Sequence, residues 1–165
     1  MAQKVLFVCL GNICRSPAAE GILRHLLHQN GQEEEILCDS AGTGDYHVGE
    51  LPDRRMRQAA QRRGIGLEGR ARQVTLQDFH DFDLLLAMDE QNYYHLLGLD
   101  RSGKYHAKVR LVCEFCRRYP DREVPDPYYG GEAGFEYVLD LLTDACEGLL
   151  NHLRVRQNSP QSGSA

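Results

Sequence analysis

Short apolar runs dominate the pattern along this chain, and longer segments with a helical alternation of apolar and polar residues separate them. Each run has the length of a buried strand, and its continuous apolar character is typical of a strand covered on both faces of a sheet. We therefore predict strands at residues 4–9, 36–40, 83–88 and 109–112.

The segments between and after these runs have the three-to-four-residue apolar period of amphipathic helices. The first is 17–29, for which we predict Ser16 as the N-cap and Pro17 as the first helical residue. Two more begin with an aspartate, which also favours a helix start: 53–63 and 89–97. The last, 132–153, has an apolar face made of Phe135, Val138, Leu139, Leu142, Ala145, Cys146, Leu149, Leu150 and Leu153. Because strands and helices alternate, the sequence predicts an α/β domain with a parallel sheet.

Length and composition are those of one globular domain. The chain has 165 residues, of which 42% are hydrophobic, so it can bury a core of useful size. We expect the domain to span residues 1–156 and a disordered tail, rich in Ser, Gly and Gln, to follow at 157–165. No apolar stretch approaches the ~20 residues that span a bilayer, and the N-terminus is too short for a signal peptide. We therefore expect no membrane association.

Charge and cysteine usage narrow the cellular setting. Six cysteines in a chain without a secretion signal do not require a disulfide framework, so we expect mostly reduced thiols and a cytoplasmic protein. The formal net charge of −5 argues against nucleic acid as a partner. Seven arginines nevertheless lie between positions 54 and 72. They form either a solvated helix face or a basic rim that attracts anionic substrates.

The strongest functional signal follows the first predicted strand and reads Cys9-Leu10-Gly11-Asn12-Ile13-Cys14-Arg15-Ser16. Its spacing suits a phosphate-binding loop between the first strand and the first helix, in which backbone N–H groups surround the anion. A helix N-terminus and Arg15 stabilise negative charge there, so Cys9 should be a thiolate near neutral pH, which is the nucleophilic form. Arg15 offers planar donors that match two phosphoryl oxygens.

Other residues of this loop fit the same interpretation. Gly11 and Asn12 tolerate the left-handed backbone that anion-binding loops often need, and Ser16 can donate to the Cys9 sulfur as the phosphoenzyme breaks down. A buried strand-end cysteine beside a surface arginine would not require this order of residues. The lysine-containing nucleotide loop is absent from the sequence, which argues against an NTPase.

Phosphoryl transfer also needs an acid for the leaving oxygen, and the candidate is Asp126. It lies between Pro125 and Pro127, which stiffen the segment, and Tyr128 and Tyr129 follow. An Asp-Pro pair alone is typical of a turn, but together with the cysteine loop we interpret Asp126 as a general acid. The tyrosines could line a crevice for an aryl phosphate, or they could be ordinary half-buried side chains.

Together these motifs resemble the low-molecular-weight protein tyrosine phosphatases, from about residue 4 to residue 153. The resemblance includes Asp39-Ser40-Ala41-Gly42-Thr43, Tyr46-His47-Val48-Gly49, Ala71-Arg72-Gln73 and Met88-Asp89-Glu90-Gln91-Asn92. It implies a four-stranded parallel sheet with helices on both faces. It also implies hydrolysis of phosphotyrosine and small aryl phosphates through a phosphocysteine, without a metal or any other cofactor.

Carried over by position, the resemblance implies roles for individual residues. Cys9 is the nucleophile, Arg15 binds phosphate, and Asp126 is the general acid that later activates water. The polar residues that hold the phosphate loop in shape are Asn12, Ser16 and Ser40, and the crevice walls are Tyr46, Tyr128 and Tyr129. The implied partner is a tyrosine-phosphorylated protein and the product is inorganic phosphate. We expect a monomer.

The remaining cysteines carry less information. In the family that the chain resembles, the cysteine matching Cys14 can form a reversible disulfide with the catalytic one; this redox role and a purely structural role fit the sequence equally well. Cys113 and Cys116 have the spacing of a metal site but lack a second pair of ligands, so we expect loop or helix-face cysteines and no metal. Cys38 and Cys146 are expected in the core.

Two other functions stay open from the sequence. An arsenate reductase shares this fold and loop but needs two further shuttle cysteines, and residues 82–97 contain none. A non-hydrolytic module, either a phosphocysteine carrier or a phosphotyrosine binder, would not need Asp126. The presence of that carboxylate therefore favours the phosphatase.

Overall fold

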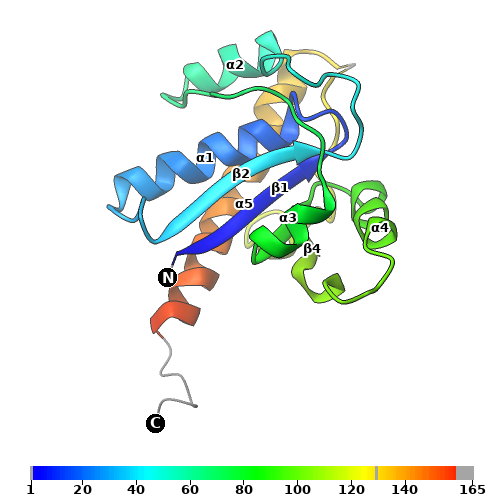
Figure 1. Ribbon diagram of the computed structural model, residues 1–165. Helices are drawn as coiled ribbons and strands as arrows, with labels where there is room; N and C mark the ends of the chain where they lie inside the picture. Colours follow the sequence, from blue (N-terminus) through cyan, green and yellow to red (C-terminus); the bar gives the residue numbers. More distant parts are fainter. Residues whose placement is uncertain (1, 129, 159–165) are drawn as a thin grey trace.

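The computed structural model describes residues 2–128 and 130–158 of the chain. Within these ranges the centre of the molecule is a parallel sheet of four strands in the order β2-β1-β3-β4 (Figure 1). The strands are β1 Gln3–Cys9, β2 Ile36–Gly42, β3 Leu84–Ala87 and β4 Val109–Leu111. Each coincides with a predicted run to within two residues at either end, and all pairings are parallel, so the predicted sheet is confirmed.

Helices connect and flank these strands. They are α1 Arg15–Gln29, α2 Arg54–Gln61, α3 Leu76–Asp81, α4 Glu90–Leu99 and α5 Glu132–Asn158, with short 3-10 turns η1 His106–Lys108 and η2 Val112–Phe115. The four predicted helices are confirmed, but the sequence prediction does not include α3. That helix starts where the Asp78 carboxylate accepts a hydrogen bond from the Thr75 N–H at 2.8 Å. Six residues are too few to display a helical period.

The helices form one layer on each face of the sheet, as predicted. α1 and α5 cover one face, with α2 packed beside α5, and α3 and α4 lie on the other (Figure 1). Alternate residues of β1 enter different cores, because successive side chains of a strand point to opposite faces. Val5 and Phe7 pack on the α1 and α5 side, while Leu6 and Val8 pack on the α3 and α4 side.

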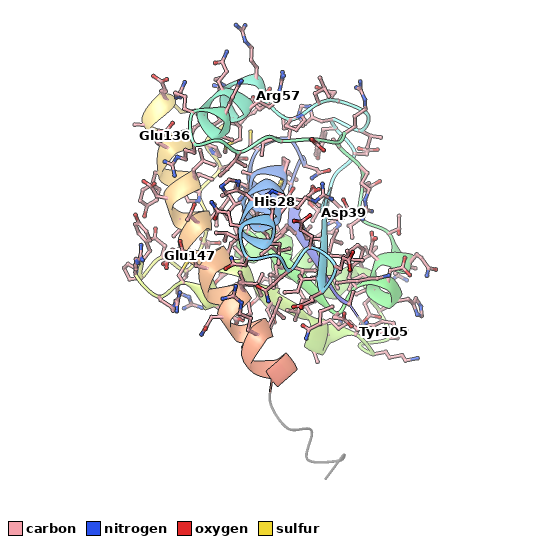
Figure 2. The ribbon with its side chains drawn as sticks, turned by 90° about the vertical axis from the view of Figure 1, so that its left-hand side faces the viewer. His28, Asp39, Arg57, Tyr105, Glu136 and Glu147 are labelled. Carbon is pink, nitrogen blue, oxygen red and sulfur yellow. The ribbon has the colours of Figure 1, made fainter. Side chains whose placement is uncertain are left out.

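α5 supplies the longest apolar face of the domain. All nine residues predicted for this face are buried, and Leu141 adds to them. In Figure 2, α5 runs down the left-hand side of the view, with Glu136 and Glu147 labelled along it. The helix continues to Asn158, past the expected domain end at residue 156, and residues 159–165 of the expected tail lie outside the described residues. No helix in the described ranges is long and apolar enough to cross a bilayer.

Two buried thiols contribute to the core as predicted. Cys38 on β2 keeps 8% of its surface exposed and Cys146 on α5 keeps 0%. Burial strongly raises the pKa of the Cys146 thiol, so this side chain stays neutral and packs as a small apolar group.

The sheet topology places the end of β1 at a crevice. β1 pairs with β2 on one side and with β3 on the other, and the helices that lead to these two neighbours lie on opposite faces. Such a reversal leaves an opening at the carboxyl ends of parallel strands, where ligands bind. Cys9 is the last residue of β1 and therefore lies at this opening, as the sequence predicts.

The start of α1 differs from the prediction. The helix begins at Arg15, so Cys14 is at the N-cap position without a capping hydrogen bond from its side chain, and Ser16 is inside the first turn. The prediction of Ser16 as N-cap is wrong because its hydroxyl is directed to the Cys9 sulfur, at 3.0 Å, instead of to the helix. Pro17 is the third helical residue, where its missing N–H costs nothing because the first turn lacks partners anyway. The aspartate caps are confirmed: Asp53 accepts from the backbone of α2 and Asp89 from that of α4.

Candidate active site

The phosphate loop wraps around a buried sulfur. Cys9 is 2% exposed, and its Sγ accepts a hydrogen bond from the Asn12 N–H at 3.2 Å. Asn12 has a φ of 58°, the left-handed conformation that brings this N–H inward, and among the described residues no other non-glycine residue has a positive φ. Asn12 therefore adopts the left-handed backbone that the sequence analysis expected it to tolerate. An anion above the sulfur would meet converging N–H donors at the start of α1.

A continuation of β2 supports the outer side of the loop. The Thr43 N–H donates to the Cys9 carbonyl at 2.8 Å, and the Gly44 N–H donates to the Leu10 carbonyl at 3.0 Å. The two segments approach so closely that a Cβ at Gly42 would lie 2.8 Å from the Leu10 carbonyl oxygen. Only glycine therefore allows β2 to pass this close to the loop.

The predicted support residues form one hydrogen-bonded chain. Asn12 Nδ2 donates to Ser16 Oγ at 2.7 Å and to Ser40 Oγ at 3.0 Å. Because Ser16 accepts from Asn12, its own hydroxyl hydrogen can point either to the Cys9 sulfur, at 3.0 Å, or to the Ala41 carbonyl, at 3.4 Å. Asn12 Oδ1 in turn accepts from the Arg72 N–H at 3.0 Å. The arrangement holds the loop from inside the protein, so that its N–H groups stay directed toward the ligand position.

Glu20 ends this chain, and the sequence analysis missed it. Its Oε1 accepts from the Ser40 hydroxyl at 2.6 Å and its Oε2 pairs with Arg24 at 2.8 Å. Burial raises the pKa of the Glu20 carboxyl. The sequence signal for this role of Glu20 was its position four residues after Ser16, on the same face of α1.

Arg15 is fixed by acceptors on two other segments. It is 3% exposed, and its Nη1 donates to Asp89 Oδ2 at 2.7 Å and to the Val124 carbonyl at 3.0 Å. Burial opposes the charged guanidinium, but Cys9 and Asp89 outweigh burial and raise the pKa of Arg15. Asp89 is a second residue that the sequence analysis missed in this role; it was assigned only to the start of α4. The available signal was a carboxylate just after a buried strand.

Asp126 lines the same opening as Cys9. Its Oδ2 is 3.7 Å from Arg15 Nη2, and its Oδ1 accepts from the Tyr128 N–H at 3.0 Å. The segment that carries it is tied to the end of β3 by a hydrogen bond from the Val124 N–H to the Met88 carbonyl at 2.8 Å. The Asp126 side chain keeps 40% of its surface exposed, so it can reach a ligand in the opening.

The opening is a cavity of about 400 Å³ that contains the predicted catalytic residues. It is lined by the phosphate loop together with Tyr46, His47, Asp126 and Tyr128. Tyr46 is 72% exposed. Tyr129, predicted as a third wall, lies outside the described residues. The sequence analysis gave no role to His47, although it belongs to the Tyr46-His47-Val48-Gly49 motif; its ring lies 6.1 Å from that of Tyr128.

Cys14 also lines this cavity, with 4% of its surface exposed. Burial and the neighbouring Asp53 and Cys9 raise the pKa of its thiol far above the usual value. Cys14 is therefore a protonated thiol in the same cavity as the sulfur of Cys9.

The other charged and thiol clusters take structural positions. Among the residues that the structure describes, four of the seven arginines between residues 54 and 72 form ion pairs with carboxylates: Arg55, Arg62, Arg63 and Arg72. Cys113 lies in η2 and Cys116 directly follows it. In the described ranges no three histidine, cysteine, aspartate or glutamate side chains are grouped to hold a metal ion.

The fold and the site define a class of enzyme, the cysteine-dependent phosphatases. A buried cysteine at the end of a strand, a surrounding loop at a helix N-terminus and an arginine across from it form a site for a phosphoryl group. A carboxylate in the same cavity can supply a proton.

Comparison with known proteins identifies the family. The family model described as low molecular weight phosphotyrosine protein phosphatase matches residues 4–159. A putative low molecular weight protein-tyrosine-phosphatase of Synechocystis is 57% identical over 151 residues, which cover 92% of this chain and 96% of that protein. YfkJ, a low molecular weight protein-tyrosine-phosphatase of Bacillus subtilis, is 43% identical over 147 residues, covering 88% and 92%.

Solved structures agree with this assignment. A protein tyrosine phosphatase from Entamoeba histolytica, with Hepes in its active site, superposes with a TM-score of 0.91 at 46% identity, covering 94% of this chain and 99% of that one. The structure of Bacillus subtilis YfkJ gives 0.88 at 39% identity, covering 96% and 98%. The chain belongs to the low-molecular-weight protein tyrosine phosphatase family, which consists of cysteine-based, metal-independent hydrolases. The predicted family, fold class and enzyme class are confirmed.

Proposed function

We propose that this chain hydrolyses phosphotyrosine with Cys9 as nucleophile, Arg15 as phosphate-binding residue and Asp126 as general acid and base. The observation that carries the proposal is that Asp126, which is far from Cys9 and Arg15 in the sequence, lines one cavity with them. The phosphate loop from Leu10 to Arg15 would hold the phosphoryl group, supported by Asn12, Ser16 and Ser40.

In the first step, the Cys9 thiolate attacks phosphorus from within the loop. The sulfur–phosphorus bond forms as the bond from phosphorus to the phenolic oxygen breaks, and Asp126 gives its proton to that oxygen. Arg15, held in place by Asp89, stabilises the phosphoryl oxygens through its planar donors. The products of this step are tyrosine and a phosphocysteine.

In the second step, water releases the phosphate. The Asp126 carboxylate takes a proton from the attacking water, and the sulfur–phosphorus bond breaks to give inorganic phosphate. The electron pair returns to the Cys9 sulfur, where the Ser16 hydroxyl at 3.0 Å can stabilise it. Asp126 gives one proton to the leaving oxygen in the first step and regains one from water in the second, so the proposed cycle closes without a cofactor or metal.

The shape of the cavity supports an aryl phosphate as substrate. Cys9 lies at its base and is almost completely buried, while Tyr46 and Tyr128 stand at its wall. A phenyl ring can stack between such rings and reach the sulfur. We therefore propose a tyrosine-phosphorylated protein as the partner, with Tyr129 as a further wall. We also propose that the chain acts as a monomer in the cytoplasm, in keeping with the six free thiols and the net charge of −5.

A leaving-group series tests this proposal through Asp126→Asn. With EDTA present, we expect the wild type to hydrolyse a phosphotyrosyl peptide and para-nitrophenyl phosphate. The variant should lose about 10²-fold or more in kcat/KM on phenyl phosphate, whose leaving group needs a proton, and much less on dinitrophenyl phosphate, whose leaving group does not. Asp121→Asn, earlier in the same segment, is the matched control. Equal losses on both substrates would remove Asp126 from the role of acid.

Cys14 offers a test of redox control. We propose that peroxide oxidises the Cys9 thiolate to a sulfenic acid, and that the Cys14 thiol then displaces water to form a Cys9–Cys14 disulfide. Peroxide should therefore inactivate the wild type, and dithiothreitol should restore most of its activity. Cys14→Ser cannot form the disulfide, so excess peroxide should inactivate it irreversibly through the higher oxidation states. Full recovery of that variant by dithiothreitol would argue for a structural role of Cys14.

A further inference from the structure

Arg55, the second residue of α2, makes contacts that the reaction scheme does not use. Its Nη2 donates to the Tyr128 carbonyl at 2.8 Å, and its Nε and Nη2 donate to the two oxygens of Asp53 at 3.3 and 3.2 Å. The guanidinium also lies over the ring of Tyr128, at 5.5 Å from its centre, and over that of Phe135, at 4.7 Å. One side chain thus joins α2, α5 and the segment that carries Asp126.

The Asp53 end of this contact is rigidly attached to the phosphate loop. The Asp53 N–H donates to the Ile13 carbonyl at 2.7 Å, so the chain before α2 is anchored on the loop itself. The Asp53 carboxylate also caps α2 by accepting from the Arg55 and Met56 N–H groups. The Asp53 carboxylate that binds Arg55 is therefore held in place beside the Cys9 site.

Tyr128, the other hydrogen-bond partner of Arg55, is two residues from the candidate acid Asp126. The Tyr128 N–H donates to Asp126 Oδ1 at 3.0 Å, so a shift of Tyr128 changes the direction of the Asp126 carboxyl. On the other side of Asp126 the segment is already held, because Val124 bonds to both Met88 and Arg15. Arg55 holds the segment on the C-terminal side of Asp126, by donating to the carbonyl of Tyr128.

We propose that Arg55 is a positioning residue that sets the distance between the Asp126 carboxyl and the leaving-group oxygen. The proposal rests on the proposed role of Asp126 as general acid. An arginine suits the task because its planar fork binds the Asp53 carboxylate and the Tyr128 carbonyl in fixed directions, whereas a lysine presents one flexible ammonium. Proton transfer in the transition state depends steeply on such distances.

The proposal predicts a defect that depends on the leaving group. Arg55→Met keeps a long apolar side chain over Phe135 but removes the donors to Tyr128 and Asp53. We expect kcat/KM on phenyl phosphate to fall about five- to tenfold, the loss of one or two hydrogen bonds at this site. On dinitrophenyl phosphate the change should stay below about twofold. Arg55→Lys should show the same dependence.

Arg54→Met is the matched control, because Arg54 is the adjacent exposed arginine of α2 and makes none of these contacts. The double variant Arg55→Met/Asp126→Asn supplies a second check. If Arg55 acts through Asp126, it should be no slower on phenyl phosphate than Asp126→Asn alone. Thermal unfolding of each protein shows whether a loss of stability accompanies the kinetic change.

The outcomes separate this proposal from the proposed function. A uniform loss of kcat/KM across the leaving groups in Arg55→Met would overturn the positioning role and leave a merely structural one. Identical behaviour of Arg55→Met and Arg54→Met would also overturn it, while Asp126→Asn could still show the leaving-group defect. If Asp126→Asn itself shows no such defect, the proposed acid is wrong, and the positioning role fails with it.

Discussion

Replacing Cys9 with serine is expected to reduce turnover to the background rate, a loss of at least about 10⁴-fold in kcat. A serine hydroxyl in this loop is not ionised near neutral pH, so no covalent phosphoenzyme can form at a useful rate. The donors that we propose for the phosphoryl group, the Asn12 N–H and Arg15, are unchanged by this substitution. Binding of inorganic phosphate should therefore persist. Hydrolysis of para-nitrophenyl phosphate at mildly acidic pH with EDTA, together with calorimetric phosphate binding, measures both effects.

Cys116→Ser is the control for this substitution. Cys116 is half-buried outside the cavity, and serine keeps a side chain of similar size and a hydrogen-bond donor at this position. Its turnover should match that of the wild type. If Cys9→Ser kept a tenth of wild-type turnover, a phosphocysteine on Cys9 could not be the main route. Loss of both turnover and phosphate binding would indicate that the loop had changed shape.

Arg15→Lys is expected to lower kcat/KM by about 10³-fold. The lysine keeps a positive charge near Asp89 but cannot contact Asp89, the Val124 carbonyl and two phosphoryl oxygens at once. Both phosphate binding and the chemical step should weaken, because the charge on the phosphoryl oxygens is held by fixed donors in a buried site. Steady-state kinetics with para-nitrophenyl phosphate and binding of inorganic phosphate separate the two contributions.

Arg63→Lys provides the comparison for Arg15→Lys. Arg63 pairs with Glu136 and Asp140 on α5, away from the cavity. The Arg63→Lys variant therefore measures the effect of replacing a paired arginine outside the cavity. Its kcat/KM should change by less than about twofold. An Arg15→Lys enzyme as active as Arg63→Lys would contradict the assignment of Arg15 to phosphate binding.

The elements that the sequence predicted correctly are those with local signals. The strands are short apolar runs, the longer helices have an apolar period, and Asp53 and Asp89 mark the starts of α2 and α4. α3 was missed because six residues give no period. The cap of α1 was wrong for a different reason. Ser16 has the residue type of an N-cap, but its hydroxyl contacts the Cys9 sulfur, and local propensity cannot show that competition.

The residues of the candidate site also differ in whether a local sequence signal reveals them. The order of Cys9, Asn12 and Arg15 reveals the phosphate loop because these residues are neighbours in one turn of chain. Glu20 and Asp89 belong to the same site but have ordinary sequence surroundings. Their roles depend on contacts with Ser40 and Arg15 that only the packed structure brings within 3 Å.

By itself the sequence determined the alternation of strands and helices, and it predicted the phosphate loop and the roles of its cysteine and arginine. These follow from interactions within a few residues, which pattern and spacing record directly. The tertiary structure alone decided how Asp126 approaches the loop, how Asp89 holds Arg15, and how Arg55 joins α2 to Tyr128. Arg15 and its acceptor Val124 are 109 positions apart. Contacts over such separations depend on how the helices and strands pack together, and no local pattern encodes them.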